Sequence, residues 1–129
     1  MDYCLDVLNA GKWVHIYPEG GVNMNPDKNK RFKWGIGRLI SECKTTPIVI
    51  PMYHVGMDKV LPPYRPYIPR LWQKVTVCIG NALPIESVLE RVSKEDGLTK
   101  RKAITDYLQE EMAKLRKQTE DYHKKSLTI

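Results

Sequence analysis

The residues best suited to chemistry in this sequence lie at 17–21, Tyr-Pro-Glu-Gly-Gly, directly after a short apolar segment. Pro18 cannot donate a backbone hydrogen bond and the glycines permit positive φ, so the pattern predicts a turn at Glu19. Ligands bind at the carboxyl ends of strands in open α/β sheets, and a carboxylate placed there is a candidate ligand-binding group. The alternative is that Glu19 is an ordinary exposed turn residue.

A cluster of five cations follows this turn within eleven residues: Lys28, Lys30, Arg31, Lys33 and Arg38. They stand before and inside a predicted helix that carries Gly35 and Gly37 near its start. Cations combined with the free N–H groups of a helix N-terminus can bind a phosphate group. The alternative is a solvated basic loop. A dinucleotide site is not favoured, because this glycine pair follows a long loop rather than a strand.

Histidines and cysteines give weaker signals. His15 or His54 could act as a general base or a ligand, but each lacks a partner at motif spacing, so a structural role is favoured. The three cysteines are widely separated and form no C-x-x-C pair. The sequence therefore predicts neither a disulfide framework nor a metal site.

Length and composition favour one folded domain with anionic partners. The chain has 129 residues, of which 42% are hydrophobic, and a formal charge of +6. This balance suits nucleic acid, phospholipid headgroups or an acidic membrane surface. Nucleic acid is the least favoured, because the aromatic residues do not share one strand face with the basic ones. No apolar run approaches the ~20 residues of a membrane span, and the N-terminus lacks the order of a signal peptide.

The hydrophobic pattern predicts an α/β fold, with a parallel or mixed sheet flanked by helices and a long C-terminal amphipathic helix. A βαβ unit with a right-handed crossover is expected over residues 1–56, a proline- and aromatic-rich loop over 57–73, and a strand with C-terminal helices over 74–129. The expected helices are 2–10, 34–43, 86–92 and 99–123, and the expected strands are 13–17, 47–53 and 74–80.

The segment 57–72 contains four prolines and a series of large apolar residues. The prolines exclude a regular helix, yet the segment is too apolar for an idle linker. Aromatic side chains interleaved with Arg65 and Arg70 suit the boundary between lipid headgroups and acyl chains. The alternative, equally favoured, is a loop packed over the sheet edge.

Residues 13–20 with 22–24, and 31–40, resemble conserved blocks of the glycerophospholipid acyltransferase family; residues 47–51 and 54–57 extend the resemblance. Residues 32–38 and 54–57 point to one mitochondrial branch of that family. The resemblance implies a phospholipid–lysophospholipid transacylase that remodels cardiolipin acyl chains, with phosphatidylcholine as a further substrate and no cofactor or metal. It also implies a mitochondrial membrane surface facing the intermembrane space. Glu19 and Gly20 would bind the glycerophosphate part of the acceptor, alongside the cations Arg31, Lys33 and Arg38.

One family feature is absent from this sequence. The family's chemistry rests on a His-x-x-x-x-Asp dyad, in which the aspartate orients a histidine base. The residues five positions after the three histidines are Gly20, Lys59 and Thr128, so none fits. The sequence is therefore expected to contain no catalytic residue, to be inactive alone, and to be a C-terminal fragment, a truncated isoform or a gene model that starts at an internal Met. The alternative function is an inactive lipid-headgroup-binding or regulatory module.

Overall fold

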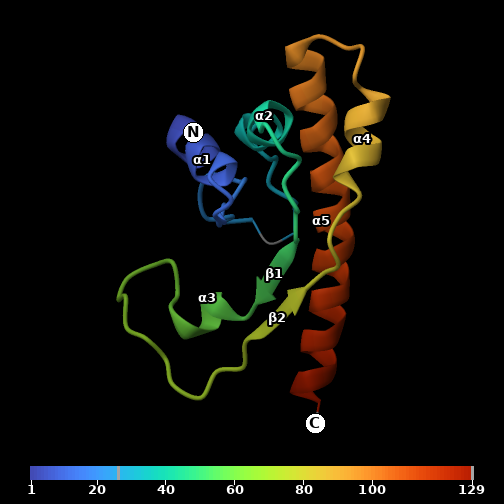
Figure 1. The fold of residues 1–129 in the computed structure, drawn as a ribbon. Coiled ribbons are helices and arrows are strands. Elements are labelled where there is room, and N and C mark those ends of the chain that lie inside the picture. Colours follow the sequence, from blue (N-terminus) through green and yellow to red (C-terminus); the bar gives the residue numbers. More distant parts are fainter. Residues whose placement is uncertain (26, 129) are drawn as a thin grey trace. The chain divides into compact units, whose positions relative to one another are not determined.

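The computed structural model describes residues 1–25 and 27–128, which form five helices and two strands (Figure 1). In chain order these are α1 (Asp2–Asn9), α2 (Gly35–Glu42), β1 (Met52–Val55), α3 (Met57–Val60), β2 (Thr76–Ile79), α4 (Ile85–Arg91) and α5 (Gly97–Leu127). The chain divides into two compact units. The first comprises Met1–Val49 with Ala82–Glu110, and the second comprises Ile50–Asn81 with the chain from Glu111 onward.

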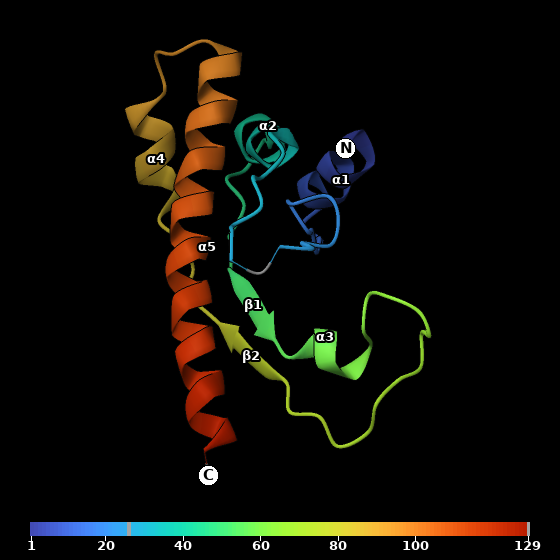
Figure 2. The same cartoon turned by 180° about the vertical axis from the view of Figure 1, so that it is seen from behind.

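The first unit is helical and holds most of the buried apolar side chains. Helix α1 packs beside α2, and α4 runs alongside the first half of α5 (Figures 1 and 2). Helix α2 approaches α5 so closely that a Cβ on Gly37 would collide with the carbonyl oxygen of Arg101. The buried apolar residues of this unit are Phe32, Leu39, Ile40, Ile85, Val88, Val92, Ile104 and Leu108.

The second unit is a β-hairpin held by the end of α5. Strands β1 and β2 pair in antiparallel register, with Tyr53 opposite Cys78 and Val55 opposite Thr76. The side chains of Leu115, Thr119 and His123 are buried along α5 at a spacing of four residues, which places them on one helix face. His123 Nδ1 lies 2.9 Å from Thr76 Oγ1, so this face of the helix contacts the hairpin.

The structure confirms the expected class, a mixture of helices and a small sheet with a long C-terminal helix. The helices expected at 2–10, 34–43, 86–92 and 99–123 correspond to α1, α2, α4 and α5, and the strand expected at 74–80 corresponds to β2. Among the described residues, no helix combines the length and the apolarity needed to cross a bilayer.

The expected βαβ unit is wrong in three respects. Residues 13–17 form no strand, and Trp13 and Tyr17 are 85% and 68% exposed. The apolar run 47–53 is strand only from Met52, and Ile48 and Ile50 are exposed rather than buried. The two strands present are antiparallel instead of parallel. The reason is that a strand requires a hydrogen-bonded neighbour, which an apolar sequence does not supply by itself. The single-domain boundaries remain an expectation.

Candidate functional site: a glycine turn beneath two lysines

Residues 17–21 form the turn that the sequence predicts at Glu19. The backbone N–H of Gly20 donates a hydrogen bond to the carbonyl of Tyr17, at 3.1 Å, and Gly20 has a φ of +67°. This left-handed conformation favours glycine, because a side chain there is crowded by the backbone. The turn therefore depends on the residue type at position 20.

Lys33 lies directly against this turn. Its backbone N–H donates to the carbonyl of Pro18, at 2.9 Å, which fixes the two segments side by side. A Cβ added to Gly20 would lie 2.6 Å from Lys33 Cε and 2.9 Å from its Nζ. The lysine side chain thus occupies the space that any larger residue at position 20 would need.

A second lysine reaches the neighbouring glycine. Lys30 Nζ lies 3.0 Å from the position that a Cβ would take on Gly21. The two ammonium groups are therefore held over the peptide backbone of the glycine pair. Neither lysine forms an ion pair with a described residue. The sequence signal for Lys30 was its place in the cation cluster, but only the fold distinguishes it from the other cations.

Phe32 anchors the basic segment between these lysines. Its side chain is buried, and its backbone N–H donates to Oε1 of Gln109 in α5, at 2.9 Å. The flanking Arg31 and Lys33 are exposed. A buried aromatic residue with cations on both sides holds the charges at the surface while restricting the backbone that carries them.

Glu19 is half-buried in the turn, and its carboxylate forms no ion pair with a described residue. The structure thus places Lys33 and Lys30 against the turn that carries Glu19 and Gly20. A carboxylate can accept hydrogen bonds from hydroxyl groups, and ammonium groups can donate to a phosphate. These groups together suit a polar ligand that carries both a hydroxyl and a phosphate.

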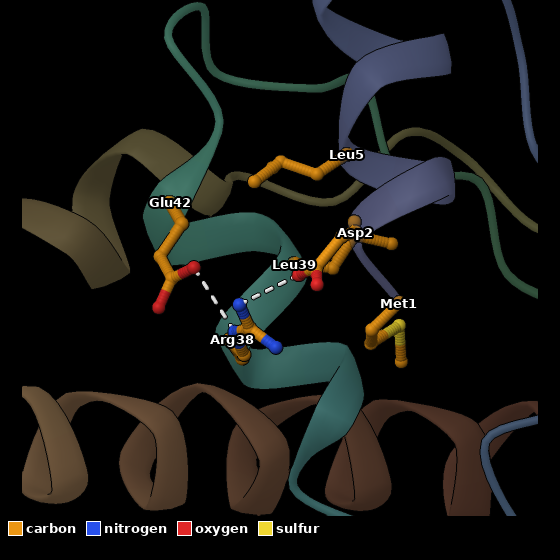
Figure 3. Close-up of a pocket in the computed structure, with 6 residues that line it drawn as sticks. All are labelled: Met1, Asp2, Leu5, Arg38, Leu39 and Glu42. Carbon is orange, nitrogen blue, oxygen red and sulfur yellow. Dashed lines mark hydrogen bonds and ion pairs between the residues drawn. The ribbon is translucent and has the colours of Figure 1, made fainter.

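Arg38 has a different environment. Its guanidinium donates to Asp2 at 2.8 Å and to Glu42 at 3.0 Å, beside a shallow hollow between α1 and α2 (Figure 3). The hydrogen bond and charge of Glu42, followed by those of Asp2, raise the pKa of the arginine. Glu42 also pairs with Arg101 of α5 at 2.8 Å. Arg38 is thus part of an ion-pair cluster that links three helices.

The glycines at the start of α2 are explained by close packing. A Cβ on Gly35 would lie 2.6 Å from Cε of Met1, and Gly37 faces α5 as described above. In the structure the approaching groups are protein side chains and backbone.

The three histidines lie in three separate settings. The ring of His15 is exposed and lies 4.9 Å from that of Tyr17, and His54 is exposed in β1, next to Tyr53. His123 is buried against Thr76. Within residues 1–25 and 27–128, no three His, Cys, Asp or Glu side chains gather as metal ligands.

Comparison with known proteins places this turn in a known family. Residues 1–55 match the family model described as Acyltransferase, and this stretch includes the glycine turn, both lysines and Arg38. Over 126 residues the chain is 38% identical to a protein named Tafazzin from Drosophila melanogaster, a match that covers 96% of the chain. Residues 1–55 of this chain therefore belong to the acyltransferase family.

Other relatives extend this result. The chain is 32% identical over 115 residues to Taffazin of Dictyostelium discoideum, covering 86% of the chain, and 35% identical over 91 residues to N-acylphosphatidylethanolamine synthase of Arabidopsis thaliana, covering 67%. It spans 33%, 39% and 31% of the fly, Dictyostelium and Arabidopsis proteins, about a third of their length. No solved structure matches it.

Proposed function

We propose that this protein is a phospholipid–lysophospholipid transacylase of the tafazzin type, and that residues 1–55 bind the headgroup of its lipid acceptor. The observation that carries the proposal is the contact of Lys33 with the Gly20 turn, because it holds a cation over exposed backbone within the part of the chain that matches the acyltransferase family.

The chemistry of the turn supports a lysophospholipid as the acceptor. Such a lipid presents a phosphate and a free glycerol hydroxyl on neighbouring carbons. Lys30, Lys33 and Arg31 supply positive charge for the phosphate, and Glu19 can accept a hydrogen bond from the hydroxyl. Arg38 has a structural role in this proposal: it holds α1 against α2, because two carboxylates already neutralise its charge.

The proposed reaction exchanges one ester for another. The acceptor hydroxyl attacks the carbonyl carbon of a donor phospholipid ester, the new ester forms, and the donor leaves as a lysophospholipid that takes up the proton. The exchange involves no net oxidation or hydrolysis, so it requires no redox cofactor and no activated acyl carrier. We propose phosphatidylcholine as donor and lysocardiolipin as acceptor, at a mitochondrial membrane surface facing the intermembrane space.

A second candidate is a headgroup-binding or regulatory module without activity of its own. The observation that favours it is the lack of an aspartate five residues after any of the three histidines, since acyl transfer of this kind needs a base and an oriented partner. For this candidate we propose that the 129-residue chain alone does not transfer acyl groups.

Disruption of the gene, followed by mass spectrometry of cardiolipins, tests the transacylase proposal. The expected result is a higher ratio of lysocardiolipin to cardiolipin. The unaltered genomic copy should return the ratio to its normal value, and a copy carrying Lys33→Gln should do so poorly. An unchanged ratio would contradict the proposal.

The purified chain, assayed with phosphatidylcholine and lysocardiolipin against a heat-killed control, tests the second candidate, that the chain alone is inactive. Transfer above that control would show that the histidine–aspartate dyad is not required.

A further inference from the structure

The loop between β1 and β2 has no role in the headgroup site proposed above. It begins at Gly56, includes the short helix α3, and returns to β2 at Thr76. The backbone N–H of Arg70 donates to the carbonyl of Val60, at 2.7 Å, and closes the base of the loop. Connections of this length are uncommon unless they are functional or disordered. Four prolines, at 62, 63, 66 and 69, restrict its backbone.

Large apolar side chains on this loop face solvent. Trp72 is 97% exposed, Leu71 is 77% exposed, and the backbone of Trp72 has a φ of +61°, which is rare for a bulky residue. The other exposed apolar residues of the loop are Met57, Leu61, Tyr64, Tyr67, Ile68 and Val75. Exposed apolar groups gathered in one segment mark an interaction surface.

The charges on the loop indicate what it binds. Residues 57–75 contain four cations and one acid: Lys59, Arg65, Arg70 and Lys74 against Asp58. Lys74 donates to the carbonyl of Ser126, at 2.6 Å, whereas Lys59, Arg65 and Arg70 form no ion pair with a described residue. An apolar protein partner would leave these cations unpaired, but an anionic lipid surface neutralises them.

We propose that residues 57–75 dock on the surface of an anionic phospholipid bilayer, with Leu71 and Trp72 in the headgroup boundary and Arg65 and Arg70 on lipid phosphates. Tyrosine and tryptophan favour this boundary, and arginine extends its charged end to the phosphates. The proposal rests on the function proposed above, since a transacylase for bilayer lipids must contact them. It adds a surface separate in sequence from the headgroup turn.

The sequence has three tryptophans, so Trp72 can be made the sole emitter by Trp13→Phe with Trp34→Phe. Vesicles of cardiolipin and phosphatidylcholine should shift its emission to shorter wavelength, and lipids brominated on the acyl chains should quench it. A matched control keeps Trp13 alone, through Trp34→Phe with Trp72→Phe. Trp13 is 85% exposed but lies outside the loop, and its emission should not shift.

Removing the loop's charge or apolar tip should weaken vesicle binding in the otherwise unaltered chain. Each of Arg65→Gln and Arg70→Gln should lower the partition coefficient about fivefold, the effect of one cation at an anionic surface. Leu71→Ser with Trp72→Ser should lower it further. Circular dichroism checks that these variants keep the helices of the parent chain.

Three outcomes would overturn the docking proposal. Unshifted Trp72 on vesicles that bind the chain would assign lipid contact to another surface. If Trp72 emission is already shifted without vesicles and the chain sediments as a dimer, the loop contacts a second copy of the chain instead of a bilayer. Vesicle binding that depends on Lys30 and Lys33 but not on Arg65 and Arg70 would reject the loop as the docking surface. That result would still agree with the proposed headgroup site. Conversely, insertion of Trp72 with unchanged cellular cardiolipin would contradict the proposed reaction alone.

Discussion

The side chain of Lys33 occupies the space above Gly20, because a Cβ added to Gly20 would lie 2.6 Å from Lys33 Cε. The backbone N–H of Lys33 donates a hydrogen bond to the carbonyl of Pro18. The cation and the turn are therefore interdependent. A change at Gly20 alters the position of the charge without removing it, which separates geometry from electrostatics in an experiment.

Gly20→Ala is expected to weaken both folding and headgroup binding. Alanine at a φ of +67° costs about 1–2 kcal/mol, and its methyl group displaces Lys33. Gly11→Ala is the matched control, because Gly11 has a φ of +73° with no atom within 4 Å of its added Cβ. Both variants should lose similar stability in urea unfolding, and only Gly20→Ala should lose affinity for lysocardiolipin. Equal affinities would indicate that the position of Lys33 is unimportant.

Lys30→Gln and Lys33→Gln are each expected to lower the affinity of the chain for anionic lysophospholipid, with the larger loss at low salt. Charge at an anionic surface is worth about 1 kcal/mol per cation and is screened by salt. Lys12→Gln serves as a control, because Lys12 is exposed in the same unit but lies outside the cluster. Lipid binding measured at two salt concentrations should distinguish the Lys30 and Lys33 variants from the Lys12 control. An equal loss of affinity in all three variants would indicate that only the net charge of the chain attracts the lipid.

Gly37→Ala is expected to destabilise the first unit by about 1–3 kcal/mol, the usual cost of adding volume to a packed site. The added methyl group would meet the Arg101 carbonyl and lie 2.7 Å from Thr105 Oγ1. Gly97→Ala, in the first turn of α5, meets no atom within 4 Å and should leave stability unchanged or slightly raised. Urea unfolding followed by circular dichroism measures both, and equal midpoints would show that α2 can move away from α5.

Asp96 is expected to make the start of α5 sensitive to acid. Hydrogen bonds from the Thr99 hydroxyl and backbone N–H lower the pKa of this carboxyl, and the backbone bond measures 2.7 Å. Because the pKa is lower in the folded state than in the unfolded state, the stabilisation is complete above the ordinary aspartate pKa. It is lost as the pH falls through the lower folded value.

Asp96→Ala should therefore reduce the melting temperature at pH 7 and have little effect at pH 2. Melting temperatures of the parent chain and the variant, measured at several pH values between these two, give the difference. A difference that did not change with pH would mean that the carboxylate charge does not contribute to capping the helix.

The sequence by itself predicted the turn at Glu19 and four of the five helices in the described residues, all but α3. Helical periodicity depends on neighbours three and four residues away, so α1, α2, α4 and α5 could be recognised from local pattern. The turn at Glu19 followed from Pro18 and the glycines, whose backbone preferences are intrinsic. The likeness to acyltransferases was also readable from residues 13–57, and the comparisons confirmed it.

The tertiary structure decided the strands, the partners of the charges and the exposure of the proline loop. Strand pairing joins residues distant in sequence, so the apolar run 47–53 did not reveal that only Met52–Val55 pairs, or that the pairing is antiparallel. Arg38 and Lys33 have similar sequence surroundings, but Asp2 and Glu42 engage the first while the second lies over Gly20. Ion pairs and burial depend on groups brought together by folding, which local sequence does not specify.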